Sequence, residues 1–356
     1  MAARSPKSIA DCERPPLERP LPSHRWGAQV WAVAVLLIVS ACAPAAGHTD
    51  ATADGTDVAG RADSTPATEK DAASHSSVGS DAGRVDADDG PAILPILASS
   101  ELAVGPNRFL FSITDRTGAL VAAPDVPVRV RFYPADIGTD VAALMSDARF
   151  VWTLEGVRGL YVADVDFPSA GRWGSQVDAD LPDGTTESVR IEYDVLSESW
   201  TPAIGSAAPV VDTPTASDVG GDLSRISSDP DPMARFYDVS VADALAARKP
   251  FVLVFATPAF CQSAACGPLL ESVKDVAAGH PELTFINVEP YVMEYRDGML
   301  RPLLDDLGRL QAAPWTDRWR LLTEPYVVVV DGEGIVRAKF EGALSLDELE
   351  AQIAAL

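Results

Sequence analysis

Short apolar runs separated by turn residues characterise the middle of this chain. Between residues 93 and 196, side chains rich in Val, Phe, Tyr and Ile alternate or cluster at 109–113, 126–132, 159–167 and 188–195. Gly, Pro, Asn and Asp interrupt these runs. Several short strands with frequent turns are typical of a β-sandwich, which we predict for 93–196. Within it, 140–148 is expected to form a short helix or an inserted loop.

Strand and helix patterns alternate after residue 233. A continuous apolar run at 251–255 is typical of a strand buried on both faces, and further strands are predicted at 283–288 and in the apolar run at 326–330. The last run is expected to form a hairpin with 334–340. Helical spacing of apolar residues is found in four segments, 239–248, 269–278, 299–310 and 344–356. Ser345 and Glu348 form a capping-box pattern at the start of the last helix. This order predicts an α/β domain with a mixed sheet.

The N-terminal segment has the pattern of an export signal. A basic flank precedes a short apolar run at 30–39. This run is shorter than the roughly 20 apolar residues that a spanning helix needs. Residues 39–42, Val-Ser-Ala-Cys, resemble the bacterial lipobox, which implies that Cys42 is lipidated and becomes the mature N-terminus. The alternative is an uncleaved signal anchor, because 27–46 is apolar enough to span a membrane. Both predict a periplasmic or extracellular protein on the extracytoplasmic face of the cell membrane.

Composition divides the chain further. Residues 43–92 contain no Ile, Leu, Met, Phe, Tyr or Trp, so they cannot bury enough apolar surface to offset chain entropy, and we expect a disordered linker. Residues 197–232 are rich in Pro, Ser, Asp and Gly and are predicted to be a second linker. The predicted organisation is a signal peptide with lipobox over 1–42, linkers over 43–92 and 197–232, a β-sandwich over 93–196 and an α/β domain over 233–356.

Charge and histidine content exclude some classes of partner. The formal net charge is −24, which disfavours nucleic acid because its recognition needs a basic surface. Residues 93–196 contain no His, no Cys and only Met145 as a sulfur ligand, so no metal site is expected there. We expect no cofactor and no metal.

Two cysteines remain in the exported part. Cys12 lies in the basic flank and Cys42 is the predicted lipid site, which leaves Cys261 and Cys266. An oxidising compartment allows such a pair to close. Because the pair lies between an apolar strand and a helix, either redox chemistry or a structural disulfide is possible.

Residues 233–356 resemble a thioredoxin fold, most closely that of the membrane-tethered, exported thiol–disulfide reductases of bacteria. The resemblance rests on 255–261, Phe-Ala-Thr-Pro-Ala-Phe-Cys, on Glu324-Pro325 before an apolar strand, and on the hairpin 331–334, Asp-Gly-Glu-Gly. Residues 93–196 resemble the YtkA-like immunoglobulin-like domains of exported bacterial proteins, through 105–109 and 170–173. The predicted fold class is therefore multidomain, with an immunoglobulin-like β-sandwich followed by an α/β thioredoxin-like fold.

The resemblance implies a thiol–disulfide oxidoreductase whose partners are protein thiols or disulfides. It makes Cys261 the nucleophile and Cys266 the resolving cysteine, with Pro325 in a cis peptide packed against them. Two features depart from the family. Four residues separate the cysteines instead of two, and 250–260 contains no carboxylate. Pro268 would begin the helix and leave both cysteines at its threshold.

Three other functions stay open. One is a binding module of the same fold with a structural disulfide. A second is an atypical two-cysteine peroxiredoxin-like peroxidase, because 257–261 resembles the Thr-Pro-x-Cys motif of that family. A third is a copper chaperone that adds His280 to the two cysteines. The segment 290–323 also carries four aromatic residues, Tyr291, Tyr295, Trp315 and Trp319. Some of them are hypothesised to line a partner groove above Cys261.

Overall fold

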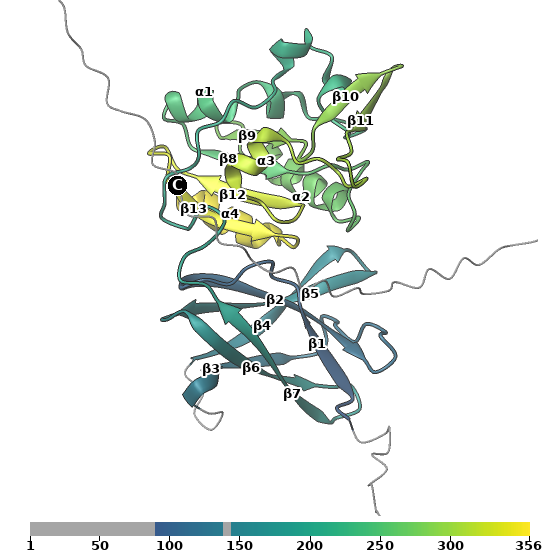
Figure 1. The fold of residues 1–356 in the computed structure, drawn as a ribbon, viewed down its shortest axis with the longest axis vertical. Helices are drawn as coiled ribbons and strands as arrows, with labels where there is room; N and C mark the ends of the chain where they lie inside the picture. Colours follow the sequence, from purple (N-terminus) through teal and green to yellow (C-terminus); the bar gives the residue numbers. More distant parts are fainter. Residues whose placement is uncertain (1–89, 138–143) are drawn as a thin grey trace, which may run out of the picture. The chain divides into compact units, whose positions relative to one another are not determined.

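The computed structural model describes residues 90–137 and 144–356 (Figure 1). All of these residues belong to one unit of the chain, 81–356. The predicted signal peptide with Cys42, the alternative anchor at 27–46 and the linker over 43–92 lie outside the described residues, apart from the last three positions of the linker. In the two described ranges, no helix combines the length and apolar character that crossing a membrane requires.

Seven strands form one antiparallel sheet that is nearly closed. In order across the sheet they are β1 (Ile93–Leu97), β2 (Gly105–Asp115), β5 (Arg158–Phe167), β4 (Leu144–Leu154), β3 (Val128–Pro134), β6 (Gly171–Asp180) and β7 (Thr186–Val195). The two ends of this order approach each other, since Leu196 after β7 bridges Ala103 before β2. The enclosed core contains stacked and edge-on aromatic rings, including Phe109, Phe132 and Trp173.

This sheet corrects the first half of the predicted fold class. The alternation of apolar residues identified several strands, but it does not determine which edges pair. Here each strand pairs with the next across a single sheet, so the expected β-sandwich of two stacked sheets does not form. Residues 144–148 begin β4 rather than a helix or an inserted loop.

The C-terminal region contains a four-stranded sheet in the order β13 (Val336–Glu341), β12 (Tyr326–Val330), β8 (Phe251–Phe255) and β9 (Thr284–Val288). Only β8 and β9 are parallel. Every residue of β8 is buried, which confirms the prediction from its continuous apolar run. Every residue of β12 is buried as well.

Four α-helices and four 3₁₀-helices complete the described residues. The α-helices are α1 (Val241–Ala246), α2 (Cys266–Gly279), α3 (Pro314–Trp319) and α4 (Leu346–Ala354). The 3₁₀-helices are η1 (Ala135–Ile137), η2 (Ala216–Val219), η3 (Leu223–Arg225) and η4 (Ala234–Tyr237). The capping box at α4 is confirmed, because the Ser345 side chain accepts from the Glu348 amide. Part of the predicted linker 197–232 packs on the C-terminal sheet, since Ala208 is buried and its N–H donates to Gly334.

The helix predicted over 299–310 is absent. A small hairpin of β10 (Met293–Arg296) and β11 (Met299–Pro302) occupies the first part of this segment. The leucines of 299–310 have the spacing of one helical face, but they do not pack into a core. Leu304 and Leu307 are 58% and 76% exposed. Pro302 would also remove a hydrogen bond from the interior of such a helix.

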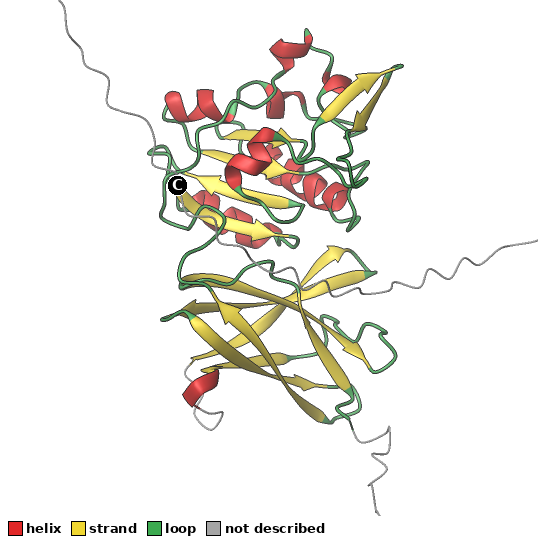
Figure 2. Ribbon diagram, in the orientation of Figure 1, coloured by secondary structure: helices red, strands yellow, loops and turns green. Residues whose placement is uncertain are grey.

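The predicted fold class is therefore wrong in its second half as well. The described residues contain thirteen strands and four α-helices, and only α2 is longer than nine residues (Figure 2). This mostly β structure does not form the α/β thioredoxin-like fold that the alternating patterns predicted. The prediction depended on a helix after the second parallel strand, where the chain instead forms a hairpin and loops.

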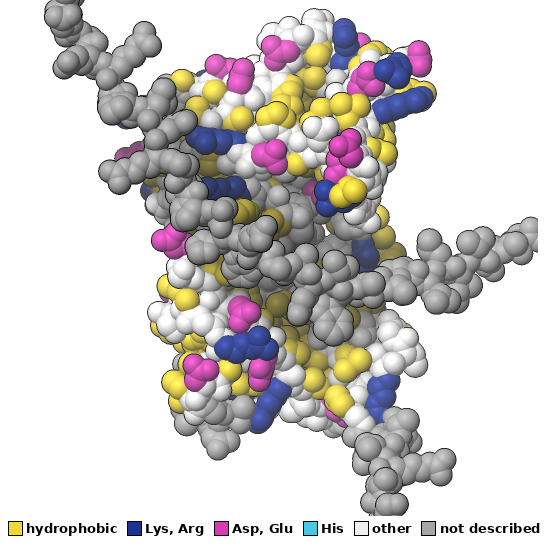
Figure 3. Space-filling view, viewed as in Figure 1, with side chains coloured by type: hydrophobic (Ala, Val, Ile, Leu, Met, Phe, Trp, Pro, Cys, Tyr) yellow, Lys and Arg dark blue, Asp and Glu magenta, His cyan; other side chains and the backbone are white. Residues whose placement is uncertain are grey.

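Charges of both signs share the molecular surface. On the face drawn in Figure 3, Lys and Arg side chains are interspersed with Asp and Glu side chains over the described residues. Ion pairs among the described residues include Arg129–Asp147 and Arg149–Asp164. The net negative charge of the chain is therefore not spread as one uniform field over this face.

Candidate functional site

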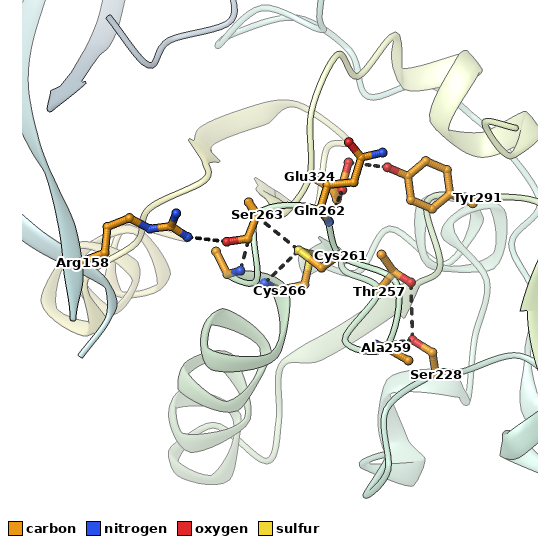
Figure 4. The surroundings of a disulfide bond; sticks show 11 residues. Arg158, Ser228, Thr257, Ala259, Cys261, Gln262, Ser263, Cys266, Tyr291 and Glu324 are labelled. Atoms are coloured by element: carbon orange, nitrogen blue, oxygen red, sulfur yellow. Dashed lines mark hydrogen bonds between the residues drawn. A yellow bond between two sulfur atoms is a disulfide. The ribbon is translucent and has the colours of Figure 1, made fainter. Parts of the chain in front are cut away.

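A disulfide joins Cys261 and Cys266 where β8 leads into α2 (Figure 4). The two Cα atoms lie 5.9 Å apart. Cys261 lies in the loop before the helix and is half-buried, whereas Cys266 is the first residue of α2 and is fully buried. The helix thus starts two residues before Pro268, and the loop provides the curvature that lets cysteines five positions apart meet.

Two polar groups contact the Cys261 sulfur. The Cys266 N–H donates to it at 3.3 Å, and the Ser263 hydroxyl lies at the same distance. The Cys266 amide belongs to the first turn of α2, where unpaired N–H groups attract negative charge. The same contacts would stabilise a Cys261 thiolate after reduction. Of the two cysteines, the partly exposed one is also the one whose sulfur has these polar contacts.

Glu324, the residue before Pro325, contacts the loop 256–265 between β8 and α2, which we call the cysteine loop. Its carboxylate accepts from the Gln262 N–H at 3.4 Å and from the Tyr291 hydroxyl at 2.6 Å (Figure 4). Burial, with the adjacent carboxylate, raises the pKa of Tyr291, which remains a neutral donor. The Glu324–Pro325 peptide is cis. The predicted site residue Pro325 thus directly follows the residue that bonds the cysteine loop.

Glu289 supplies a buried carboxyl group at the edge of the sheet where β8 ends. It directly follows β9, is 3% exposed, and accepts from the Ser228 N–H at 2.5 Å. Its Oε2 has no hydrogen-bond partner among the described residues. Burial raises the pKa of Glu289 from 4.5 to about 7, although hydrogen bonds from Thr257 and Ser228 oppose the rise. Thr257 lies four residues before Cys261, so this carboxyl group is close to the base of the cysteine loop.

The raised pKa of Glu289 predicts how the free energy of unfolding depends on pH. Because the pKa is higher in the folded chain than in the unfolded one, the stability that Glu289 contributes is fully present below about pH 4.5 and is lost as the pH rises through about 7. At about 1.4 kcal/mol per pKa unit, the free energy of unfolding falls by roughly 3 kcal/mol at most over this pH range. We expect Glu289→Gln to remove this pH dependence from the free energy of unfolding, measured by denaturant titration between pH 4 and pH 8.

The control for this prediction is Glu294→Gln, at a partly exposed carboxylate on β10 paired with Arg296. Its unfolding curve is expected to follow that of the natural chain across the same pH range. Parallel curves for Glu289→Gln and the natural chain would contradict the assignment of a raised pKa to Glu289.

The aromatic residues expected above Cys261 separate into different environments. Trp319 is fully buried and packs on Phe255, with 6.1 Å between ring centroids, so it is not one of the aromatic residues that line a groove. Trp315 donates its indole N–H to the Glu289 carbonyl at 2.6 Å. Trp315, Tyr291 and Glu289 share a cavity of about 140 Å³. Tyr295 is partly exposed beneath the guanidinium group of Arg225.

His280, the histidine of the copper hypothesis, lies at the end of α2 and pairs with carboxylates. Its Nε2 is 2.7 Å from Glu350 and its Nδ1 is 3.4 Å from Glu282. In the ranges 90–137 and 144–356, no three His, Cys, Asp or Glu side chains are grouped as a metal site would require. The structure does not bring His280 and the cysteines together as a ligand set.

Glu289, Glu324 and Arg158 are the site residues that sequence reasoning missed. Glu289 can be identified from the sequence, because it directly follows the second predicted strand and the ends of parallel strands lie at one edge of the sheet. Glu324 adjoins the predicted Pro325. Arg158 belongs to β5, and its side chain donates to the Ser263 carbonyl oxygen. No local pattern connects residues that lie 105 positions apart.

No protein-family model matches this chain, and no curated protein matches it. Among solved structures, the crystal structure of the PmoD soluble domain from Methylocystis sp. ATCC 49242 (Rockwell) is similar over 29% of this chain and 90% of that chain. The sequence identity is 15% and the TM-score is 0.20. A similarity at this score carries no argument about the fold or the function of the chain.

Proposed function

We propose that the chain is a thiol–disulfide oxidoreductase that exchanges disulfides with protein partners through Cys261 and Cys266. The observation that supports this most directly is the unequal environment of the two sulfurs. Cys261 is half-buried and accepts the Cys266 amide at 3.3 Å, whereas Cys266 is fully buried. Exchange needs one sulfur that an external disulfide can reach and a second sulfur close enough to attack the resulting mixed disulfide.

The reaction can be written with its electrons and protons balanced. The Cys261 thiolate attacks one sulfur of a substrate disulfide, so the substrate S–S bond breaks and a mixed disulfide forms. The Cys266 thiolate then attacks the Cys261 sulfur, closes the internal disulfide and releases the substrate. Two electrons pass to the substrate, whose two thiolates take up two protons. The chain's two thiols release the same number to solvent.

The surroundings of Cys261 fit the attacking role. The amide and the Ser263 hydroxyl stabilise negative charge on its sulfur in the first step. In the second step, the same sulfur is the electrophile, and the buried Cys266 at the start of α2 reaches it without movement of the helix. We also propose that Cys42 attaches the chain by a lipid to the extracytoplasmic face of the cell membrane, where protein disulfides persist.

A two-substrate comparison tests the proposal. The reduced full-length chain is mixed with a peptide disulfide and, separately, with hydrogen peroxide, and the Cys261–Cys266 disulfide is followed by mass spectrometry. We expect rapid oxidation by the peptide, with release of peptide thiol, and slow oxidation by peroxide. Rapid reaction with peroxide and none with the peptide would instead indicate a peroxidase. A chain that reacts with neither would have a structural disulfide.

A further inference from the structure

The turn between β4 and β5 reaches the cysteine loop. Arg158, the first residue of β5, donates from Nη2 to the Ser263 carbonyl oxygen (Figure 4). Ser263 is two residues after Cys261, and its hydroxyl lies 3.3 Å from the Cys261 sulfur. The seven-stranded sheet therefore contributes a charged side chain to the loop that carries the accessible cysteine.

Arg158 extends from a part of the sheet that is firmly docked. The Glu348 carboxylate on α4 pairs with Arg108 of β2 at 3.0 Å and with Arg149 of β4. Arg108 also donates to the Ala343 carbonyl at 3.0 Å. Ala343 is buried in an apolar cluster with side chains from three strands of the sheet, namely Leu110, Val151 and Val162. Because these contacts fix β2, β4 and β5 on the C-terminal region, they also fix the position from which Arg158 reaches the loop.

Two side chains form hydrogen bonds with adjacent backbone groups of the cysteine loop. Glu324 accepts the Gln262 N–H, and Arg158 donates to the carbonyl of the next residue, Ser263. Ala264 follows with φ of +59°, a left-handed conformation that is unfavourable for a residue with a Cβ. Such a conformation persists only where its surroundings enforce it. Because both side-chain contacts need this loop conformation, they favour the arrangement in which Cys261 lies beside Cys266.

We propose that Arg158 is a positioning residue for disulfide exchange, which holds the 262–264 loop so that Cys261 stays beside Cys266. This inference rests on the proposed function of the pair. It gives the seven-stranded sheet a part in the redox site. Without Arg158, the reduced loop would sample more conformations, and Cys266 would close the ring less often.

The test compares Arg158→Gln with Arg158→Lys in the full-length chain. The control is Arg129→Gln, which removes an exposed arginine of the same sheet that pairs with Asp147. The equilibrium constant for ring closure is measured in glutathione redox buffers. Loss of one exposed, charge-assisted hydrogen bond corresponds to about a fivefold decrease for Arg158→Gln. The lysine variant is expected to retain part of the effect and the control to match the natural chain.

A second measurement separates this inference from the proposed function. Hydrogen exchange of the 262–266 amides in the oxidised chain is expected to accelerate about fivefold in Arg158→Gln and to stay unchanged in the control. Unchanged exchange and unchanged ring closure in Arg158→Gln would overturn the inference while leaving the redox function intact. If the natural chain does not react with glutathione, the proposed function fails, and with it the role of Arg158 in exchange.

Discussion

Replacing Cys266 by serine is expected to trap the chain in a mixed disulfide through Cys261. In the natural chain, Cys266 lies next to the Cys261 sulfur and releases the substrate by an intramolecular attack. Intramolecular thiols react at effective concentrations far above those of free thiols. We therefore expect the mixed disulfide with a peptide to live at least about a hundredfold longer in Cys266→Ser, measured by mass spectrometry after acid quenching.

The matched variant is Cys261→Ser, which should form no mixed disulfide because the remaining thiol is fully buried. Both variants lack the internal disulfide, so the reduced natural chain is the reference for their stability. If Cys261→Ser accumulated the peptide adduct and Cys266→Ser did not, the assignment of nucleophile and resolving cysteine would be reversed.

Removing the Glu348 side chain is expected to lower the free energy of unfolding by about 3–5 kcal/mol. Its carboxylate pairs with Arg108, and both side chains are only 15% exposed. Glu348→Ala would leave the Arg108 guanidinium group buried without its carboxylate, although it keeps the Ala343 carbonyl and the Phe340 ring. The variant also loses the capping box of α4. Denaturant unfolding at pH 7 measures the change.

The loss of stability in Glu348→Ala is expected to depend on pH and to be smaller in acid. Burial raises the pKa of Glu348, but Arg108 and Arg149 outweigh it, so the net pKa is lowered. Stability from this carboxylate is therefore present above pH 4.5 and is lost as the pH falls through the lower folded pKa. The difference between Glu348→Ala and the natural chain should accordingly shrink in acid.

Glu350→Ala is the control on the same helix. Glu350 is 47% exposed and pairs with His280, and exposed ion pairs contribute about 0–1 kcal/mol. Equal losses of stability in the two variants would show that the buried network around Glu348 does not hold the sheet in place.

Several elements of the fold could be predicted from local sequence alone. The buried strands at 251–255 and 326–330 are signalled by continuous apolar runs, and the start of α4 is signalled by Ser345 and Glu348. These signals are local because the residues that form each element are its own neighbours. The same holds for the loop position of Cys261 and for the turn at 331–334.

The larger arrangement could not be predicted in this way. Alternating runs indicate strands but not their edge partners, so the single nearly closed sheet was expected to be two sheets. The leucines at 303, 304 and 307 have helical spacing, yet spacing does not reveal whether a core lies beside them. In the structure these leucines are exposed. The α/β expectation failed at this point.

The site was predictable only in part. The cysteine pair is identified by its isolation in the exported sequence and by its place between strand and helix. Glu289 follows from the parallel pairing of β8 and β9 once that pairing is known. Arg158 depends on the docking of the seven-stranded sheet through Glu348, which no local pattern encodes.

The equilibrium reduction potential of the Cys261–Cys266 pair tests the central proposal most directly. The full-length chain is equilibrated in dithiol–disulfide buffers of known potential, and the fraction of internal disulfide is measured after alkylation. The proposed exchange function predicts a potential between about −300 and about −120 mV, reached within minutes. A potential far below about −300 mV, with no exchange, would show a structural disulfide and contradict the proposal.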